Sequence, residues 1–588
     1  MKIKEKIKLL RQEMAKEGMD AYYIPTSDFH QSEYVAKYFK VREYMSGFTG
    51  SRGMMVVTQK EAVIWVDGRY FTQADKELKG SGIKALKMGQ PQVPTLNQYL
   101  SDFFVDGGVL GFDGRIISVT DAAMLKTPGV KFKSKDLIDA IWTDRPRLPF
   151  GECFVMPAKY VGEKADKRIE RVRTEMRENG HDVMVVSALE DVAWLLNLRG
   201  HDIENTPVFL SYVTISMKQV VLYVDKKKCS PAVMKYLKSI KVKVKPYNAL
   251  QQDLKELKGI SVVIEPQSLS MVHRGVIASS CKVSEKASVI RLYRAFKTNQ
   301  ELKSLRQAHI KDGAALTKFI HWVKTNVEKR QITEWDALVK LNEYRSKMDL
   351  FIEPSFTSIT AAGANAAMMH YSASEQNHAV LEKRGFFLVD SGGQYFDGTT
   401  DVTRTIVLGK VSEKEKKYYT AVLRGMIRLS QANFLKGVSG ADLDILARGP
   451  VWDLDLDYQC GTGHGVGFCL GVHEGPHGFR WGVYRTPLEE GMVITNEPGI
   501  YLPEEFGIRI ENELIVQAKT KNFYGQFMNF ETMTLAPIDL DAIIPSEMTK
   551  EELTFLNDYH EEVYKKISPF MTPKEKIWLK HETRKILK

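Results

Sequence analysis

The amino-acid sequence predicts a mixed α/β protein in which two related N-terminal α/β domains precede a larger third domain. Three observations lead to this fold class. The chain has 588 residues, which is more than one hydrophobic core usually serves. Its first half contains a repeat in which helical and strand-like segments alternate. Near residue 296 the pattern changes to one long helix, followed by short strands and glycine-rich turns.

The repeat consists of two segments that share four residues at identical spacing. Each segment is typical of an amphipathic helix that ends at a glycine and continues into a strand of β-branched or aromatic residues. Two later strand-like runs, VIWVDGR and VVLYVDKK, each lead into an aspartate. We therefore predict two α/β domains of one kind, over residues 1–157 and 158–296. The shared positions are Arg11, Met14, Gly18 and Asp20 in the first copy and Arg173, Met176, Gly180 and Asp182 in the second.

The third domain is predicted over residues 297–588. Apolar residues recur near helical spacing from Glu301 to Val327, which indicates a long helix. From residue 350 onward the chain is rich in glycine, short strands and polar turns. A C-terminal extension from about residue 538 contains helical stretches with aromatic residues that we expect at the surface, as a contact for another chain. These aromatic residues are Phe555, Tyr559, Tyr564 and Trp578.

Charge and hydropathy argue against nucleic-acid binding and against a membrane protein. The chain carries 83 Lys and Arg against 73 Asp and Glu, which gives a net charge of +10. The two signs are interleaved almost everywhere, whereas a nucleic-acid-binding protein concentrates its basic residues. No apolar run approaches the roughly 18–20 residues that span a bilayer. We expect no nucleic-acid partner and no membrane association.

The cysteines and the N-terminus favour the cytoplasm. The five cysteines are widely spaced and form no CxxC motif, which is typical of a reducing compartment and not of a disulfide scaffold. The N-terminal segment MKIKEKIKLLRQEMAKEG contains three glutamates and lacks the apolar core of a signal peptide. Its pattern predicts an amphipathic helix.

Two aspartates of the third domain stand where a strand or turn does not need them. Asp390 ends the apolar run FFLVD, and Asp401 follows a Gly-Thr-Thr turn before the strand-like VTRTIVL. A hairpin would bring the two carboxylates together, where they repel each other unless a cation or a shared proton compensates. Considered alone, the pair also fits two aspartates that cap turns.

A histidine and two glutamates extend this set. His464 lies between glycines in GTGHGVG, which leaves room for a ligand at the imidazole. Glu497 lies in TNEPGIY, and Glu511 lies inside the strand-like FGIRIENE, where a carboxylate faces solvent unless it is paired or ligating. Singly, each is more often a surface acid or a satisfied histidine. Together, four carboxylates and one imidazole suit divalent cations such as Mn²⁺ and suffice for two metals ~3.5–4 Å apart.

In their order and local context, these residues resemble the dinuclear metallopeptidases of the pita-bread fold, a group that includes methionine aminopeptidase, prolidase and aminopeptidase P. The motifs GTGHGVG…VHEGP, NEPGIY and GIRIENE carry the resemblance in the third domain. In the first half, SGFTGSRGMMVV, WVDGRYFTQADKEL, WLLNLRG and TPVFLSY resemble the two N-terminal domains of the three-domain, cytosolic-type aminopeptidase P. The resemblance implies two creatinase-like domains followed by a pita-bread catalytic domain.

The resemblance also implies roles for individual residues. Asp401 and Glu511 would bridge two divalent metal ions, which are usually manganese in this family, with zinc or cobalt as alternatives. Glu497 would accept a proton from the metal-bridging water, so that a hydroxide attacks the peptide bond. His370 and His473 would contact the peptide and the tetrahedral intermediate. The full set of implied metal ligands is Asp390, Asp401, His464, Glu497 and Glu511.

Three further residues near these motifs are assigned less directly. Arg509 is similar to a family arginine that braces the carboxylate cluster, although an ordinary arginine on a strand face is the alternative. Cys460 stands four residues before the metal histidine, where several family members have another histidine, so no role is transferred to it. His477 matches no family role, and we expect it beside the site or at its rim.

The implied activity is hydrolysis of the N-terminal Xaa-Pro bond of peptides that have proline at position two. One alternative is an Xaa-Pro dipeptidase, or prolidase, which the chain length and the doubled N-terminal domain disfavour. Another is a non-catalytic pita-bread module that binds proteins, but such modules lose metal ligands and this chain keeps all five. The resemblance further implies a homodimer that involves the C-terminal domain.

Overall fold

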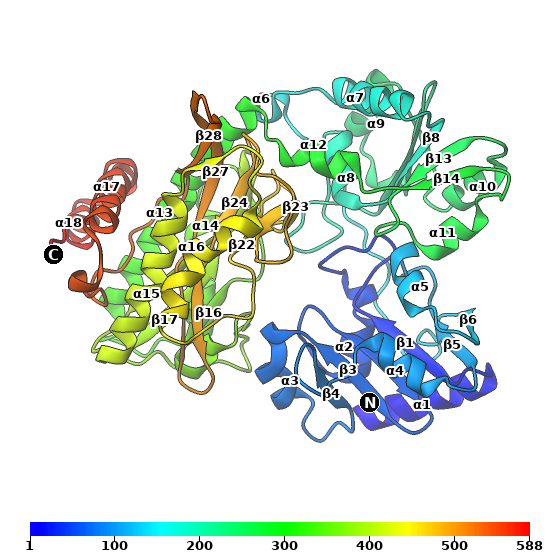
Figure 1. The fold of residues 1–588 in the computed structure, drawn as a ribbon, viewed down its shortest axis with the longest axis horizontal. Helices are drawn as coiled ribbons and strands as arrows, with labels where there is room; N and C mark the ends of the chain where they lie inside the picture. Colours follow the sequence, from blue (N-terminus) through cyan, green and yellow to red (C-terminus); the bar gives the residue numbers. More distant parts are fainter. The chain divides into compact units, whose positions relative to one another are not determined.

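The computed structural model describes residues 1–588, which divide into two compact units. The first unit comprises residues 1–156 and 163–290, and the second comprises residues 157–162 and 291–588. Each unit combines sheets and helices (Figure 1), and this confirms the predicted mixed α/β class. No helix of the chain combines the length and the apolar composition needed to cross a bilayer. No two cysteines form a disulfide.

The first unit contains two six-stranded sheets with the same topology. Their strand orders are β4-β3-β2-β1-β5-β6 and β12-β11-β10-β8-β13-β14. The strands of the first sheet are β1 (Ala21–Pro25), β2 (Met54–Thr58), β3 (Ala62–Val66), β4 (Lys84–Lys87), β5 (Gly108–Phe112) and β6 (Val130–Ser134). Those of the second are β8 (Val183–Val186), β10 (Ser211–Ser216), β11 (Val220–Val224), β12 (Val242–Lys245), β13 (Ser261–Ile264) and β14 (Lys282–Glu285).

Helices connect the strands of both sheets. A short antiparallel pair is formed by β7 (Phe154–Val155), which precedes the second sheet in the chain, and β9 (Leu198–Arg199), which lies between β8 and β10. The central strand of each sheet pairs antiparallel with one neighbour and parallel with the other. The helices are α1 (Ile3–Lys16), α2 (Val41–Ser46), α3 (Phe71–Glu77), α4 (Leu96–Phe103), α5 (Val119–Leu125), α7 (Ala165–Glu178), α8 (Leu189–Leu195), α9 (Pro231–Ser239), α10 (Ala249–Glu256) and α11 (Met271–Val276). Helix α12 (Val289–Ala295) follows β14 and continues into the second unit of the chain.

The repeated residues occupy equivalent places in the two halves of the unit. Met14 and Met176 are fully buried near the ends of α1 and α7. Gly18 and Gly180 follow these helices with φ angles of 61° and 66°, a left-handed conformation that glycine adopts without steric cost. The sequence repeat is therefore a repeat of structure.

The repeated aspartates make the same contacts as well. Asp20 accepts a hydrogen bond from the Val109 backbone N–H at 2.8 Å, and its own N–H donates to the Val109 carbonyl. Asp182 forms the same two bonds with the backbone of Ser261, again at 2.8 Å to the carboxylate. In both sheets, an aspartate thus joins the start of the central strand to the start of its parallel neighbour.

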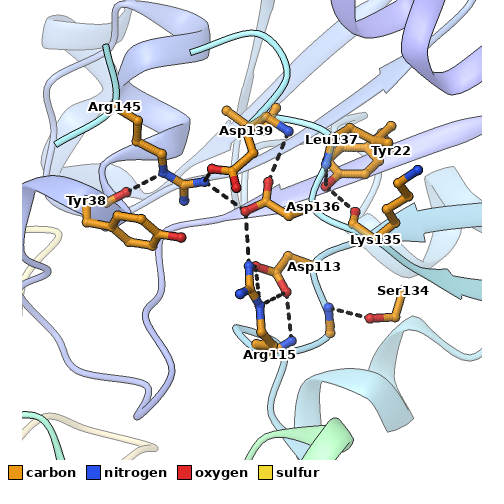
Figure 2. A network of polar contacts seen from close by, with 12 residues as sticks. Tyr22, Tyr38, Asp113, Arg115, Ser134, Lys135, Asp136, Leu137, Asp139 and Arg145 are labelled. Carbon is orange, nitrogen blue, oxygen red and sulfur yellow. Dashed lines mark hydrogen bonds and ion pairs between the residues drawn. The ribbon is translucent and has the colours of Figure 1, made fainter. Parts of the chain in front are cut away.

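A network of charged side chains fixes the segment that follows the first sheet (Figure 2). Arg145 donates to Asp136 at 2.8 Å and to the Tyr38 carbonyl at 3.0 Å. Arg115 donates to the same Asp136 at 3.1 Å and to Asp113 at 2.8 Å. Because both guanidinium groups bind Asp136, the chain beyond β6 is held against the first domain before it leaves for the second.

The second unit is built from several smaller sheets. A six-stranded sheet has the order β21-β28-β27-β24-β22-β23, and two three-stranded sheets have the orders β16-β17-β20 and β15-β18-β19. Strands β25 and β26 form a separate pair. The strands are β15 (Phe351–Pro354), β16 (Ile359–Ala362), β17 (Phe386–Ser391), β18 (Gly393–Tyr395), β19 (Gly398–Thr399), β20 (Val402–Val407), β21 (Phe434–Leu435), β22 (Gly463–Gly465), β23 (Glu474–Phe479), β24 (Val493–Asn496), β25 (Gly499–Leu502), β26 (Phe506–Arg509), β27 (Asn512–Asn522) and β28 (Gly525–Thr532).

Helices cover these sheets (Figure 1), and the predicted long helix is among them. It spans Asn299–Asn326 as α13, and Thr298 and Glu301 form a capping box at its start. Helix α15 packs on β24 and β28, α16 on β23, and α14 on β16. The remaining helices of the unit are α6 (Ala158–Val161), α14 (Glu334–Ser346), α15 (Glu413–Ser430), α16 (Gly440–Trp452), α17 (Lys550–Ile567) and α18 (Pro573–Glu582).

The aromatic residues of the C-terminal extension do not form the exposed surface that the sequence suggested. Tyr559 is buried, and Phe555, Tyr564 and Trp578 are partly buried against the core of the same unit. They pack there because α17 also inserts Leu553, Leu556 and Val563 into that core. The expectation of surface aromatics was wrong, since the period of the helix places most of them on its inner face.

Candidate metal centre

Five residues from separate elements of the second unit converge on one site. Asp390 lies in β17 and Asp401 directly precedes β20, and these two strands pair antiparallel. His464 is the middle residue of β22, and Glu497 follows β24 in the six-stranded sheet. Glu511 lies in the short break between β26 and β27, not within a strand as the alternation of FGIRIENE suggested. The site therefore lies where two sheets meet.

His464 stands at the centre of the cluster. Its Nε2 lies 3.5 Å from Asp401 Oδ2 and 3.4 Å from Glu497 Oε1. One ligand atom each from Asp401, His464 and Glu511 lie within 4.8 Å of one another, which is the spacing of a group that can hold a metal ion. Asp390 and Glu497 belong to the same electrostatic cluster, because their charges act on both Asp401 and Glu511.

The backbone fixes the tautomer of His464. Its Nδ1 lies 2.9 Å from the Gly465 carbonyl oxygen, which can only accept a hydrogen bond. Nδ1 therefore carries a proton, and Nε2 faces the carboxylates. This is the arrangement in which a histidine ligates a metal through Nε2 while a carbonyl orients its ring.

Burial makes negative charge on these carboxylates energetically costly. Burial, followed by the charges of Asp390 and Glu497, raises the pKa of Asp401 well above its usual range. Burial also raises the pKa of Glu511 well above its usual range, and the Asp401 charge adds to the effect. Asp390 Oδ1 and Glu511 Oε1 are buried without a hydrogen-bond partner. Buried carboxylates with orphaned oxygens fit divalent cations, which compensate the charge and use the free lone pairs.

Arg509 braces one side of the cluster. Its Nη2 donates to Asp390 Oδ2 at 2.5 Å, and its Nη1 donates to the Tyr501 hydroxyl at 2.6 Å. Its Nε donates to Thr403 Oγ1 at 3.2 Å. The side chain is almost fully buried, so this arginine is not the ordinary residue of a strand face that the sequence left as an alternative.

Sequence reasoning missed two residues that contact the cluster. Thr403 donates a hydrogen bond to Glu511 Oε2 at 2.7 Å. Glu513 accepts from the Asp401 backbone N–H at 2.5 Å and lies 3.2 Å from His309 Nε2. Glu513 could have been suspected from the sequence, because the motif IENE contains a second glutamate two residues after Glu511. A single threonine in a strand, such as Thr403, gives no such indication.

The two histidines expected to contact substrate lie in different surroundings. The His473 ring stands edge-on to that of His464, with centroids 4.2 Å apart. His370 is half-buried and follows the 3₁₀ turn η4 (Gly363–Ala367), which packs against β25 and β26. The role of His370 in binding the substrate stays a prediction.

Two other residues are now placed. His477 is fully buried with Nε2 2.8 Å from the Val493 carbonyl, and burial lowers its pKa to about 4. It is therefore a neutral histidine that lies beside the site, packed against Gly465, and not at its rim. Cys460 is partly buried against the core that contains Tyr458 and Ile500, and its carbonyl accepts a hydrogen bond from Arg448 at 2.8 Å.

Comparison with known protein families covers nearly the whole chain. Residues 303–518 match metallopeptidase family M24, and residues 526–586 match the C-terminal region described for that peptidase family. Residues 6–141 and 144–301 each match a creatinase/prolidase N-terminal domain. These matches confirm the predicted order of two related N-terminal domains and a pita-bread metallopeptidase domain, while the exact boundaries at 157 and 296 stay predictions.

Similar proteins extend over the full length. Aminopeptidase P2 of Arabidopsis thaliana is 37% identical, covering 97% of this chain and 86% of the relative. Xaa-Pro aminopeptidase 1 of Dictyostelium discoideum is 38% identical, covering 99% and 96%. An X-prolyl aminopeptidase structure from Caenorhabditis elegans, described as a cytosolic enzyme with a di-nuclear active site, superimposes with a TM-score of 0.95 at 32% identity over 100% of both chains. A Bacillus anthracis Xaa-Pro dipeptidase covers 65% of this chain with a TM-score of 0.52 at 26% identity.

Proposed function

The chain belongs to metallopeptidase family M24, and from this membership we propose that it is a metal-dependent Xaa-Pro aminopeptidase. It removes the first residue of peptides that have proline at position two. The observation that carries the proposal is the convergence of Asp401, His464 and Glu511 in a chain whose full-length relatives are named Xaa-Pro aminopeptidases.

We assign the five clustered residues to a pair of divalent cations. Asp390, Asp401, His464, Glu497 and Glu511 would together hold the two ions. The orphaned oxygens of Asp390 and Glu511 support this assignment. Oxygen-rich donors with one imidazole favour manganese, and zinc or cobalt are the alternatives.

Glu497 is suited to accept a proton during catalysis. When bound, the two cations supply a water whose pKa is low enough for nucleophilic attack near neutral pH. The Glu497 side chain is 18% exposed, against 12% for Asp390 and 6% for Asp401, so it is the most accessible of these carboxylates to an entering substrate. It takes the proton that is released as the peptide carbonyl is attacked.

The imidazoles of His370 and His473 hold the reacting peptide. As hydrogen-bond donors, they stabilise the negative charge that develops on the carbonyl oxygen. The position of His473 next to His464 supports this role for it. The acidic cluster attracts the free N-terminal amine of the substrate, which limits cleavage to the first peptide bond.

Selectivity for proline follows from its chemistry. A proline nitrogen carries no hydrogen in a peptide bond, so a pocket that selects it offers shape without an acceptor for that nitrogen. The competing activity, hydrolysis of Xaa-Pro dipeptides alone, is disfavoured because the dipeptidase from Bacillus anthracis covers only 65% of this chain. A non-catalytic binding module is disfavoured because all five ligand positions are kept.

We further propose a homodimer in the cytoplasm. The similar Caenorhabditis elegans enzyme is described as cytosolic. The dimer rests on family resemblance. Light scattering of the full-length protein at micromolar concentration gives twice the chain mass if the dimer forms, and a single chain mass contradicts it.

The decisive test is metal analysis combined with a peptide panel. The purified protein is loaded with manganese, zinc or cobalt and assayed on peptides that differ only at position two and in length. We expect cleavage of tripeptides and longer peptides with proline at position two, and little cleavage with alanine there. Cleavage restricted to dipeptides identifies a dipeptidase, and no cleavage with any metal contradicts the proposal.

A further inference from the structure

Glu334, at the start of α14, is a buried carboxylate that the proposed mechanism does not use. Its side chain is fully buried and all of its contacts are hydrogen bonds from neutral donors. A buried carboxylate without a cation is costly unless several donors compensate its charge. The arrangement of those donors therefore indicates what the residue does.

All of the donors come from one segment of chain, residues 362–379, which we call the His370 segment. The Ala362 N–H donates to Glu334 Oε1 at 2.7 Å, and the Ala379 N–H donates to Oε2 at 2.7 Å. These two contacts fasten the first and last residues of the segment. The Asn365 amide lies between both oxygens, at 3.1 and 3.0 Å.

The remaining donor stands beside His370. The Tyr371 hydroxyl donates to Glu334 Oε2 at 2.7 Å. Backbone bonds reinforce the closure, because the Glu334 N–H donates to the Ala379 carbonyl at 2.9 Å. The same carboxylate thus holds the residue after His370 and closes the loop that carries it.

The His370 segment also lies directly against the site. Ala366 packs so closely on Gly507 in β26 that a Cβ there would lie 1.9 Å from the Ala366 carbonyl oxygen. Two residues later, the same strand carries Arg509, which contacts Asp390. A shift of the segment therefore moves His370 relative to the metal-binding cluster.

We propose that Glu334 is a positioning residue for His370. The Glu334 carboxylate clamps the His370 segment at both ends and at Tyr371, the residue that follows His370. The proposal rests on the proposed function, because the role of His370 does. Glu334 itself does not touch the reacting atoms. Its replacement should misplace His370 without removing any ligand of the cluster, and such a displacement lowers the rate strongly.

Glu334→Gln is the primary variant. It keeps the shape of the side chain but replaces one acceptor oxygen with an amide that donates, so at least one donor of the segment is left facing another donor. Tyr371→Phe removes a single donor and is the milder variant. Glu552→Gln is the control. Glu552 lies at the start of α17 and is also buried, but it pairs with Arg424 and Arg428 and not with the His370 segment.

Kinetics on an Xaa-Pro peptide, metal content and amide hydrogen exchange are measured for each manganese-loaded variant. We expect Glu334→Gln to lower kcat/KM by roughly 100-fold, mainly through kcat, with normal metal content. Exchange should accelerate within the His370 segment and not elsewhere. Tyr371→Phe should lose several-fold in the same direction, and Glu552→Gln should melt at lower temperature with wild-type kcat/KM.

A double variant separates positioning from general stability. If Glu334 acts through His370, Glu334→Gln adds no further loss in a His370→Ala background. The proposal is overturned if the losses in kcat/KM from Glu334→Gln and His370→Ala multiply in the double variant, or if amide hydrogen exchange in the His370 segment is unchanged. Full activity of Glu334→Gln or of Tyr371→Phe also overturns it. If the wild-type protein cleaves no Xaa-Pro peptide, the proposed function fails, while the exchange measurement still decides whether Glu334 fixes the segment. Should Glu334→Gln not fold, Tyr371→Phe carries the same tests.

Discussion

Arg509 and Asp390 form a buried ion pair in which Nη2 of the arginine donates to Oδ2 of the aspartate at 2.5 Å. The pair occupies one carboxylate oxygen and leaves the other, Oδ1, buried without a hydrogen-bond partner. Arg509 therefore orients Asp390 so that its free oxygen is available to a metal ion. The Tyr501 hydroxyl holds the guanidinium from the opposite side.

Replacing Arg509 tests this orientation. Arg509→Met leaves Asp390 Oδ2 and the Tyr501 hydroxyl without their donor, so we expect kcat/KM to fall about 10- to 100-fold and metal affinity to weaken. Arg509→Lys retains the charge but not the forked geometry, and it should recover part of the loss. Metal titration followed by activity assays measures both effects. Wild-type kinetics in Arg509→Met would show that the ion pair has no part in the site.

Removing a ligand tests the metal assignment. Asp390→Asn and His464→Ala each delete one donor of the proposed pair, so most of the bound metal and nearly all activity should be lost. Elemental analysis of the purified variants measures occupancy. Asn522→Ala, at the far end of β27, serves as the control and should keep both. Full occupancy with near-normal turnover in either ligand variant excludes that residue as a ligand.

Glu497→Gln tests the proton acceptor. The amide keeps the size of the side chain but cannot accept the proton, so turnover should fall by orders of magnitude. The acidic limb of the pH dependence of kcat, measured between about pH 5 and pH 8, should differ between the variant and the wild-type protein. A profile of unchanged shape would rule out Glu497 as the base.

Stability should depend on pH and metal together. The raised pKa values of Asp401 and Glu511 mean that the folded, metal-free protein keeps protons that the unfolded chain loses as pH rises. The free energy of unfolding of the metal-free protein therefore decreases as pH rises above the ordinary carboxyl range. Bound metal replaces these protons. The difference in melting temperature between the metal-loaded protein and the chelator-treated protein should therefore grow between about pH 5 and pH 8. A difference that stays constant over this range contradicts the raised pKa values.

The C-terminal helices are expected to be essential for folding. Ending the chain at Ile538 removes α17 and α18, and with them Leu553, Leu556 and Val563 from the core. Loss of several buried aliphatic side chains costs more than the stability of a typical domain. The shortened chain should be insoluble or unfolded by circular dichroism. A soluble, folded and active product would show that the helices are dispensable.

Much of the fold was predictable because it depends on periodic signals. The repeat of Met14 and Gly18 at Met176 and Gly180 predicted two domains with equal topology, since the same residues end the same helix in both. The long helix was predicted to within two residues at each end. The C-terminal aromatics were misplaced, because an exposed face and a buried face of a helix differ only in which neighbouring element is present.

The site was predictable as a set of residues but not as a geometry. Glycine-flanked His464 and the carboxylates near it stand out by type, whereas their contacts depend on pairing between distant strands. Nothing in the sequence indicated that Thr403 reaches Glu511 or that Glu334 holds the segment of His370. Such contacts arise only when the tertiary fold brings the segments together.

The proposed ligand positions are divided between two sheets, since Asp390 belongs to the β16-β17-β20 sheet and His464 to the six-stranded sheet. A cation bound between them acts as a cross-link in the interior, as a disulfide does in a secreted protein. Loss of the metal supply would then shorten the lifetime of the enzyme against cellular proteases as well as abolish its activity. The amount of enzyme in a cell would follow metal supply even at constant synthesis.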